Sequence, residues 1–182
     1  MGLTPDLVVG DLDSLDLGLR HELEAAGVRF EVHPTHKDET DLELALRLAL
    51  AEGATEIEIL AMLGGRVDQS LANLHLLARP EWTAARLQVT EDNQTILPVR
   101  SNQDMTIIGE SGDLLSLVPL TPLVTGVTLE GVEWPLRDAT LHFGSTLTIS
   151  NVLVSPMARL RVGEGLVLVV HRSVAREGEE ML

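Results

Sequence analysis

The chain of 182 residues changes its pattern of secondary-structure signals once, close to Asp92-Asn93. Before that point, short apolar runs alternate with helix-like segments, which predicts a mainly parallel, Rossmann-like sheet with helices. After it, short β-like runs follow one another between Gly, Pro, Asn and Asp, which predicts an antiparallel β-sandwich. We therefore expect an α/β fold with two domains: an α/β domain over residues 1–93 and a β-sandwich over residues 94–182.

The clearest single element is a helix over 40–52, where apolar residues recur at three- and four-residue spacing. The other strands expected in the first half lie at 7–9, 28–32, 57–63 and 87–90, with helices at 17–26 and 68–79. The β-like runs of the second half lie at 95–99, 105–109, 114–118, 124–129, 139–142, 146–150, 158–162 and 166–170.

Composition excludes several classes of protein. The net charge of −15 argues against nucleic acid as a partner, because that binding depends on many Lys and Arg contacts to phosphate. No apolar run reaches the roughly 18 residues of a membrane span, and no signal-peptide pattern opens the chain. We therefore expect a cytoplasmic protein that does not enter membranes. The absence of cysteine excludes disulfides and thiolate metal sites.

The first polar cluster is Asp11 and Asp13, which directly follow the predicted strand at 7–9. In an extended segment, residues two apart point the same way, and carboxylate oxygens are the ligands that Mg²⁺ prefers. The alternative is that Asp13-Ser14 only caps the helix that follows.

The second cluster is the sequence KDETD at 37–41. Lys37, the only lysine of the chain, supplies a compact positive charge for phosphate, and Asp38 and Asp41 lie one turn apart around a helix start. The alternative is a capping box of Thr40 and Glu43, with acids that favour the helix N-terminus.

The third cluster is GGRVDQSLANL at 64–74. Gly64 and Gly65 let the backbone approach a ligand closely, Arg66 offers a forked donor for phosphate, and Asp68 opens a helix. The alternative is a glycine turn with Asp68 as the helix cap. Because ligands bind at the carboxyl ends of parallel strands, the three clusters together favour a phosphate-binding pocket at one sheet edge.

Other patterns in the sequence say less about function. The segment LGGRVDQS lacks the Gly-Lys-Ser/Thr ending of a P-loop, which argues against an ordinary P-loop enzyme. His33 and His36 have a spacing that a metal could use, but no third ligand lies near them in the sequence, so we interpret them as part of a surface loop.

In order and spacing, PDLVVGDLDSL, KDETDLELAL and GGRVDQSLANLHLL resemble motifs of the thiamine pyrophosphokinase family. In the second half, SLVPL, GVTLEGVEWPLRDATL and GSTLTISN resemble the sandwich domain of that family, including the pair Ser150-Asn151. The resemblance implies transfer of diphosphate from ATP to thiamine with Mg²⁺, giving thiamine diphosphate and AMP. It also implies a homodimer whose active sites lie between the subunits.

The resemblance also implies roles for individual residues. Asp11, Asp13 and Asp41 would lie in the Mg²⁺–phosphate region, with one of them accepting a proton, while Lys37 and Arg66 stabilise phosphate charge. Asp68 would lie where nucleotide and thiamine meet, and Ser150-Asn151 on the thiamine side. The remaining residues predicted to bind substrate are Asp38, Thr40, Gly64, Gly65 and Gln69.

Three departures from the family pattern are visible. Gln69 stands where the family usually has histidine, so a role that needs a titrating imidazole is lost. Val152 stands where an acid is common. The first strand of the family and its Asp-Gly-Gly-Ala loop do not precede Asp11. A misplaced start, a deliberate truncation and a natural variant are the alternatives, and of these we expect a misplaced start, because the retained motifs look selected for activity.

Two other functions stay open at this point. One is a related diphosphotransferase that acts on another small alcohol, such as a pterin. The other is a truncated dimer that binds thiamine or nucleotide without turning it over.

Overall fold

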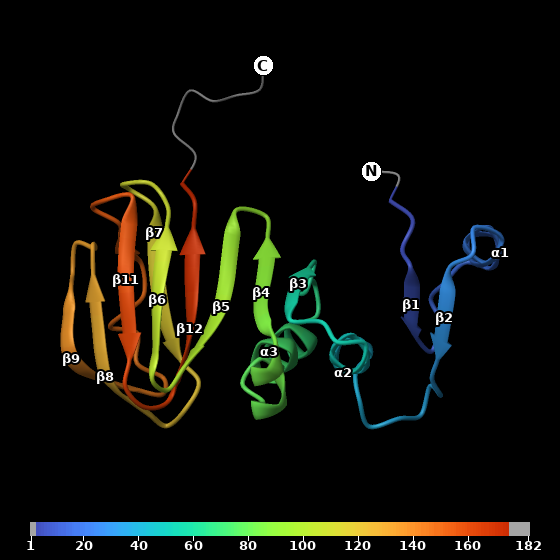
Figure 1. Ribbon diagram of the computed structural model, residues 1–182, viewed down its shortest axis with the longest axis horizontal. Helices are drawn as coiled ribbons and strands as arrows, with labels where there is room; N and C mark the ends of the chain where they lie inside the picture. The colour runs from blue at the N-terminus through green and yellow to red at the C-terminus, as the bar shows by residue number, and fades with distance from the viewer. Residues whose placement is uncertain (1–2, 175–182) are drawn as a thin grey trace, which may run out of the picture. The chain divides into compact units, whose positions relative to one another are not determined.

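The computed structural model describes residues 3–174. The chain forms two compact units, Met1–Thr55 (the N-terminal unit) and Glu56–Leu182 (the C-terminal unit). Parallel strands with helices and antiparallel sheets are both present, so the predicted α/β fold class is confirmed (Figure 1).

The N-terminal unit contains two parallel strands and two helices. Its elements are β1 (Leu7–Gly10), α1 (Leu17–Ala25), β2 (Arg29–Val32) and α2 (Asp41–Ala51). The register of the two strands pairs Leu7 with Arg29 and Gly10 with Val32. The predicted stripe of α2 is reflected in its burial, since Leu46 is 2% exposed. All four elements lie close to the ranges expected from the sequence.

The C-terminal unit contains one α-helix, one 3₁₀-helix and ten strands among the described residues. The six-stranded sheet has the order β10-β7-β12-β5-β4-β3, and the four-stranded sheet has the order β6-β11-β8-β9. The elements are β3 (Glu56–Leu60), α3 (Val67–Leu76), η1 (Pro80–Ala84), β4 (Arg86–Glu91), β5 (Gln94–Arg100), β6 (Gln103–Ile108), β7 (Leu114–Pro119), β8 (Leu123–Glu130), β9 (Leu136–His142), β10 (Asn151–Val152), β11 (Met157–Val162) and β12 (Leu166–Arg172).

A hairpin joins the parallel strands of the C-terminal unit to its antiparallel strands. β3 and β4 are parallel, whereas β4 turns at Asp92-Asn93 and pairs antiparallel with β5. The parallel strands of the chain are therefore divided between two sheets, because β3 and β4 continue the sheet of the sandwich while β1 and β2 pair only with each other. The predicted domain boundary between residues 93 and 94 falls in this hairpin turn and stays a prediction.

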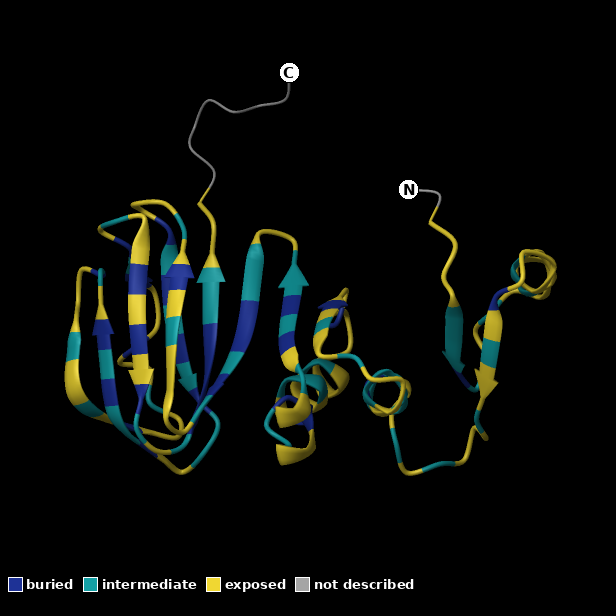
Figure 2. Cartoon of the chain, in the orientation of Figure 1, coloured by how far each residue is buried: buried dark blue, intermediate teal, exposed yellow. Residues whose placement is uncertain are grey.

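The core of the C-terminal unit follows from strict alternation along its strands. In β11 every second residue is buried, and β7 shows the same period, as expected for strands with one face in a sandwich core (Figure 2). Fully buried core residues include Leu115, Leu117, Val124, Val127, Leu129, Leu153, Leu160, Val167 and Val169.

One local prediction fails in this unit, and one element was missed. The expected strand at 146–150 is a series of turns, because Thr148 exchanges hydrogen bonds with Leu117 outside the strand pattern and Ser150 has a left-handed φ of 60°. The short strand β10 follows it instead. The 3₁₀-helix η1 was not expected; Pro80 begins it, and the buried Trp82 donates to the carbonyl of Leu76 at 2.7 Å.

Arg100 fastens the end of α3 to the sandwich. Its guanidinium donates to the carbonyl oxygens of Leu77, Ala78 and Arg79 at 2.8 to 3.1 Å. These carbonyls follow the last turn of α3, where carbonyl oxygens lack partners within the helix; that of Arg79 also accepts from the Trp82 N–H of η1 at 3.4 Å. Burial lowers the pKa of Arg100 from its ordinary value.

Asp113 is a buried carboxylate in the C-terminal unit, only 4% exposed. It accepts hydrogen bonds from His171 Nε2 at 2.8 Å, from the Glu110 N–H at 2.9 Å and from the Val174 N–H at 3.0 Å. Desolvation raises its pKa, but the bonds from Glu110, Val174 and His171 outweigh this, so the pKa lies below its ordinary value of 3.8. The carboxylate therefore stabilises the fold only while it is ionised.

This lowered pKa predicts a loss of stability in acid. Because the folded pKa is below the unfolded one, the stabilisation is complete above about pH 4 and is lost as the pH falls through the folded pKa. We expect Asp113→Asn to lower the urea midpoint at pH 7 and to flatten its decline below pH 4. The matched control Asp104→Asn, whose side chain is 82% exposed, should leave both quantities unchanged. If the urea midpoint of Asp113→Asn declined below pH 4 as steeply as that of the unaltered chain, the prediction would be contradicted.

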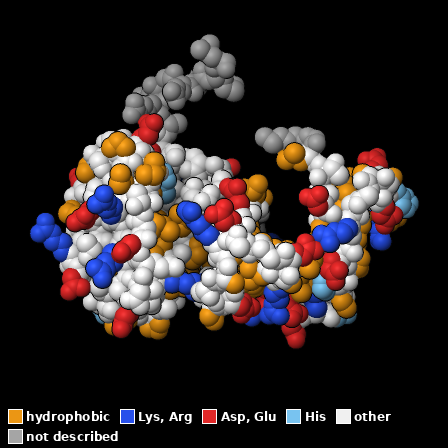
Figure 3. All heavy atoms as spheres, viewed as in Figure 1, with side chains coloured by type: hydrophobic (Ala, Val, Ile, Leu, Met, Phe, Trp, Pro, Cys, Tyr) orange, Lys and Arg blue, Asp and Glu red, His pale blue; other side chains and the backbone are white. Residues whose placement is uncertain are grey.

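No helix in the described part of the chain is long and apolar enough to cross a membrane. On the face drawn in Figure 3, acidic and basic side chains lie among one another.

Candidate functional site

The first cluster forms a tight turn after β1. Leu12 has a left-handed φ of 60°, and the N–H of Asp13 donates to Asp11 Oδ1 at 3.2 Å. The helix that follows is capped by Asp16, which accepts from Gly18 and Leu19 at 2.9 and 3.1 Å. The capping alternative for Asp13 is therefore wrong. A left-handed non-glycine residue is costly, and such strain concentrates at functional sites.

The second cluster brings the end of β1 against the start of α2. Lys37 Nζ lies 2.9 Å from Asp41 Oδ1, and the Lys37 side chain is only 13% exposed. Gly10 has a φ of +148°, and a Cβ at this position would lie 3.0 Å from Asp41 Oδ2. Because Gly10 has no side chain, the Asp41 carboxylate has room to lie beside the end of β1.

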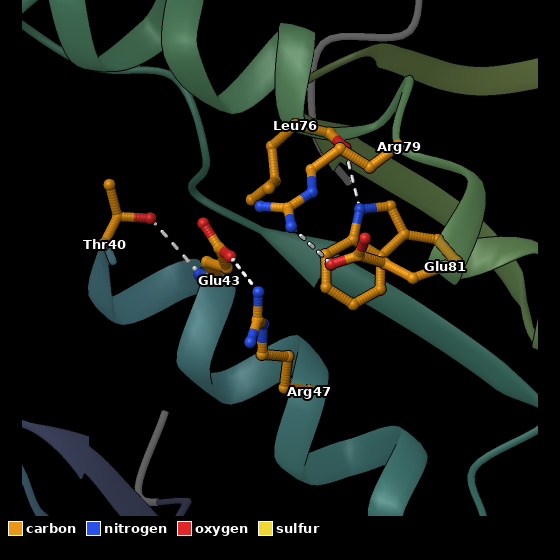
Figure 4. Close-up of polar contacts among 7 residues, drawn as sticks. Thr40, Glu43, Arg47, Leu76, Arg79 and Glu81 are labelled. Carbon is orange, nitrogen blue, oxygen red and sulfur yellow. Dashed lines mark hydrogen bonds and ion pairs between the residues drawn. The ribbon is translucent and has the colours of Figure 1, made fainter. Parts of the chain in front are cut away.

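The cap of α2 is separate from this ion pair. Thr40 Oγ1 accepts from the Glu43 N–H at 3.2 Å, and Glu43 pairs with Arg47 at 2.7 Å (Figure 4). Thr40 therefore caps α2, which confirms the Thr40 half of the predicted capping box. Because Thr40 serves the helix end, the carboxylate of Asp41 is left to contact Lys37. Asp38 is exposed at the same loop.

The third cluster is the loop Ala61–Arg66 and the first turn of α3. The helix begins after Arg66, which has no side-chain cap bond, so Asp68 lies in the first turn and its predicted alternative role as the cap is wrong. Arg66 Nε donates to Asp68 Oδ1 at 3.1 Å, and a second bond joins the same side chains. The hydrogen bond from Arg66 lowers the pKa of Asp68. Both side chains are about two-thirds exposed, so the pair faces solvent.

A pocket of about 370 Å³ opens at this loop, and Gly64, Gly65, Arg66 and Gln69 line it. Neither glycine has an atom within 4 Å of the position of a Cβ, so their backbone is open to a ligand. Backbone N–H groups beside a helix N-terminus favour anions. The predicted residues Gly64, Gly65, Arg66, Asp68 and Gln69 therefore gather at one loop and helix start.

The supports of this loop were not predicted. Ser70 Oγ lies 3.2 Å from the Gly64 nitrogen, and Asn73 Nδ2 donates to the Met62 carbonyl at 3.0 Å. Glu91, the last residue of β4, accepts from the Leu63 N–H at 3.0 Å. Asn73 is part of the quoted motif GGRVDQSLANLHLL, whereas only its place at a strand end could have pointed to Glu91.

Loss of the Glu91 carboxylate should loosen the loop. We expect Glu91→Ala to weaken the binding of a phosphate ligand at this loop about tenfold, because a hydrogen bond to a charged group contributes about 1.5–3 kcal/mol. Glu91→Gln keeps an acceptor oxygen and should recover most of the affinity. The control is Glu58→Ala on β3, whose carboxylate accepts from Thr90 at 2.7 Å and does not touch the loop. Equal affinities of Glu91→Ala and Glu58→Ala for the phosphate ligand would refute this role.

Ser150 and Asn151 lie at the start of β10. Asn151 is 5% exposed, and its amide oxygen accepts from the N–H of Trp134 at 3.1 Å and of Val152 at 2.9 Å. Its amide nitrogen donates to the Trp134 carbonyl at 2.8 Å. The Ser150 N–H donates to Ser116 Oγ at 2.9 Å, and the Ser150 side chain is exposed. The side-chain amide of Asn151 is therefore hydrogen-bonded to main-chain groups.

The donors suit a hard cation that arrives with phosphates. Among residues 3–174, no group of three or more His, Cys, Asp or Glu side chains is close enough to hold a metal ion. Mg²⁺ is usually held by one or two carboxylates together with waters and substrate phosphates, so a complete protein cage is not required. Asp11 and Asp13, two carboxylates of one tight turn, fit that mode of binding, whereas the carboxylate of Asp41 is already paired with Lys37.

Comparison with known proteins gives a consistent result over almost the whole chain. The family model described as "Thiamin pyrophosphokinase, catalytic domain" matches residues 1–90, and "Thiamin pyrophosphokinase, vitamin B1 binding domain" matches residues 94–167. Thiamine pyrophosphokinase of Bacillus subtilis is 29% identical over 93% of this chain and 79% of its own length. Thiamine pyrophosphokinase 1 of Oryza sativa is 24% identical over 93% of this chain and 67% of its own.

Solved structures agree. The crystal structure of thiamine pyrophosphokinase from Bacillus subtilis superposes with a TM-score of 0.84 at 28% identity, covering 96% of this chain and 81% of that one. Thiamin pyrophosphokinase from Candida albicans has a TM-score of 0.79 at 15% identity, over 94% and 74% of the two chains, and shows the shared fold.

Proposed function

Because the chain belongs to the thiamin pyrophosphokinase family, we propose that it transfers the diphosphate of ATP to the hydroxyl of thiamine. The products are thiamine diphosphate and AMP. The observation that carries the proposal is that both family models match consecutive parts of the chain, with the polar clusters of the first part at strand ends and helix starts. The protein is therefore a transferase that uses ATP, and its second part takes thiamine.

In this reaction the thiamine oxygen forms a bond to the β-phosphorus of ATP, and the bond from that phosphorus to the α–β bridging oxygen breaks. The residues contribute mainly position and charge. Lys37 and Arg66 balance phosphate charge, and the backbone at Gly64-Gly65 approaches the phosphates. One of Asp11, Asp13 and Asp41 accepts the proton of the hydroxyl, and Asp68 lies where nucleotide and thiamine meet.

Mg²⁺ is the metal that we propose for this site, with Asp11, Asp13 and Asp41 as the residues that would hold it. When bound, it would neutralise phosphate charge. Asp38, Thr40 and Gln69 complete the nucleotide side, and Ser150 and Asn151 belong to the thiamine side. The acidity of the chain suits the cationic thiazolium of thiamine.

We further propose a homodimer in the cytoplasm, with each active site built from both subunits and with residues 1–93 and 94–182 as its two domains. Mixing two inactive variants, Asp68→Asn and Ser150→Ala, tests the shared site. A shared site predicts partial recovery of activity after subunit exchange. No recovery, together with a monomer in sedimentation, would contradict it.

The function is tested by measuring AMP formed from ATP, Mg²⁺ and thiamine. The expected result is AMP and thiamine diphosphate in equal amounts, with no AMP when thiamine is omitted. Turnover with a pterin alcohol but not with thiamine would assign the related diphosphotransferase instead. Binding of thiamine in calorimetry without any AMP would assign a non-catalytic binding protein.

A further inference from the structure

A cavity of about 600 Å³ lies within the C-terminal unit. Its walls come from the end of η1, the start of β4, the second half of β5 and the first half of β6. Sites for small organic ligands usually have volumes of roughly 300–1,000 Å³. The cavity therefore has the size of a small-molecule site.

The cavity and the loop with Gly64 and Gly65 lie at opposite ends of β4. Arg86 begins this strand and lines the cavity, whereas Glu91 ends it and supports the loop. At about 3.3 Å per residue, the strand separates the two places by roughly 17 Å. A small ligand in the cavity therefore does not reach the loop.

Two arginines make the cavity positive. Arg100 is half-buried and donates to three main-chain carbonyls, and Arg86 is exposed. In the described part of the chain, neither has a carboxylate within ion-pair distance, although Glu56 lies opposite Arg86 in the strand register. Asp104 is the one acid among the lining residues, and its side chain is 82% exposed. These uncompensated cations attract anions locally in a chain of net charge −15.

The amide side chain at the cavity adds a further donor. Gln103 Oε1 accepts from the N–H of Arg100 at 2.8 Å, so the amide nitrogen of Gln103 is left to donate. The guanidinium of Arg86 also offers donors only. Carboxylate and phosphate oxygens, which accept hydrogen bonds, complement this set of groups.

Much of the remaining lining is apolar. Trp82 and Leu87 are buried, and Met105 packs against the core of the sandwich. Apolar side chains give nothing to a bare inorganic ion, but they remove the apolar part of an organic ligand from water. The indole of Trp82 favours a flat partner, because aromatic rings stack or meet edge to face.

We propose that this cavity is a second ligand site, which takes a small organic anion with a flat apolar body. The acidic group would lie at Arg86 and Gln103. The apolar body would lie against Trp82, Leu87 and Met105. This site is separate from the transferase activity and does not depend on it.

The test uses 2-naphthoate as the probe, because it joins one carboxylate to a flat apolar body. Calorimetry with the full chain should show saturable binding with a Kd of about 1 mM or lower. In Arg86→Gln the affinity should fall about tenfold, because a charge-assisted hydrogen bond is lost. The uncharged 2-naphthamide should bind the unaltered chain more weakly by a similar factor.

Arg137→Gln is the matched control. Arg137 lies on β9, is exposed and does not line the cavity. The Arg137→Gln variant should bind 2-naphthoate as tightly as the unaltered chain does. Absence of saturable binding to the unaltered chain, or equal affinities of Arg86→Gln and Arg137→Gln, would overturn the proposal.

The two tryptophans of the chain report where the probe binds. In a ¹H–¹⁵N spectrum, the indole N–H signal of Trp82 should shift during the titration and that of Trp134 should stay in place. The variant Trp134→Phe assigns the two signals. A shift of the Trp134 signal alone would place the probe elsewhere and overturn the proposal. None of these measurements needs turnover, so they stand even if the proposed transferase activity fails its own test.

Discussion

Gly10→Ala should reduce kcat about a hundredfold, because a misplacement of about 1 Å at a reacting site can cost that much. The new Cβ would lie 3.0 Å from Asp41 Oδ2 and 3.1 Å from its Cγ, so the carboxylate has to move away from the end of β1. The φ of +148° adds backbone strain of order 1–3 kcal/mol. Initial rates at saturating ATP and thiamine measure the first effect, and urea unfolding measures the second.

Gly27→Ala is the matched control for this variant. Gly27 belongs to the same unit and has a φ of +83°, but no atom lies within 4 Å of its Cβ position. The Gly27→Ala variant should lose about as much stability as Gly10→Ala and should retain the kcat of the unaltered chain. If both variants lost activity equally, strain in the N-terminal unit, rather than displacement of Asp41, would be the cause.

Lys37→Ala should lower kcat by about 10² to 10³, the usual cost of removing a group that stabilises developing charge. The ammonium of Lys37 lies 2.9 Å from Asp41, and only 13% of the Lys37 side chain is exposed. Because Lys37 is the only lysine of the chain, no other lysine can take its place. Lys37→Arg should recover little, because a planar guanidinium does not fit the space of a compact ammonium. Rates across a range of ATP concentrations separate kcat from KM.

The control for Lys37 is the exposed ion pair of Arg29 and Glu52 in the same unit, with a distance of 2.9 Å. Surface pairs contribute little to stability, and this one lies on no predicted site. Arg29→Ala should therefore keep full activity. A normal kcat in Lys37→Ala would remove this lysine from the proposed chemistry.

Most of the fold was predictable because burial imposes a period on the sequence. The stripe of α2 and the alternation in β7 and β11 reflect single buried faces, so their element type followed from spacing alone. The segment at 146–150 has a similar alternation, but Thr148 bonds to Leu117 and Ser150 turns left-handed. Contacts made over more than thirty residues decided that segment, and no local pattern reports them.

The candidate site shows the same division between local and distant causes. Its clusters follow strands, so Asp11, Asp41 and Gly64 could be selected from sequence. The acid that caps a helix could not be selected in this way. Asp16 rather than Asp13 caps α1, because the left-handed Leu12 delays the start of the helix. The engagement of Asn151 with Trp134 spans 17 residues and depends on the pairing of their two segments.

The hairpin at Asp92-Asn93 limits how the two parts of this chain that the family models match can be exchanged by recombination. The boundary between the family models lies where Val89 pairs with Ile96 and Glu91 pairs with Gln94 across a two-residue turn. A recombination event at this boundary has to preserve that register, or the loop support at Glu91 leaves its place beside Leu63. The halves are therefore exchangeable as sequences only together with their shared hairpin.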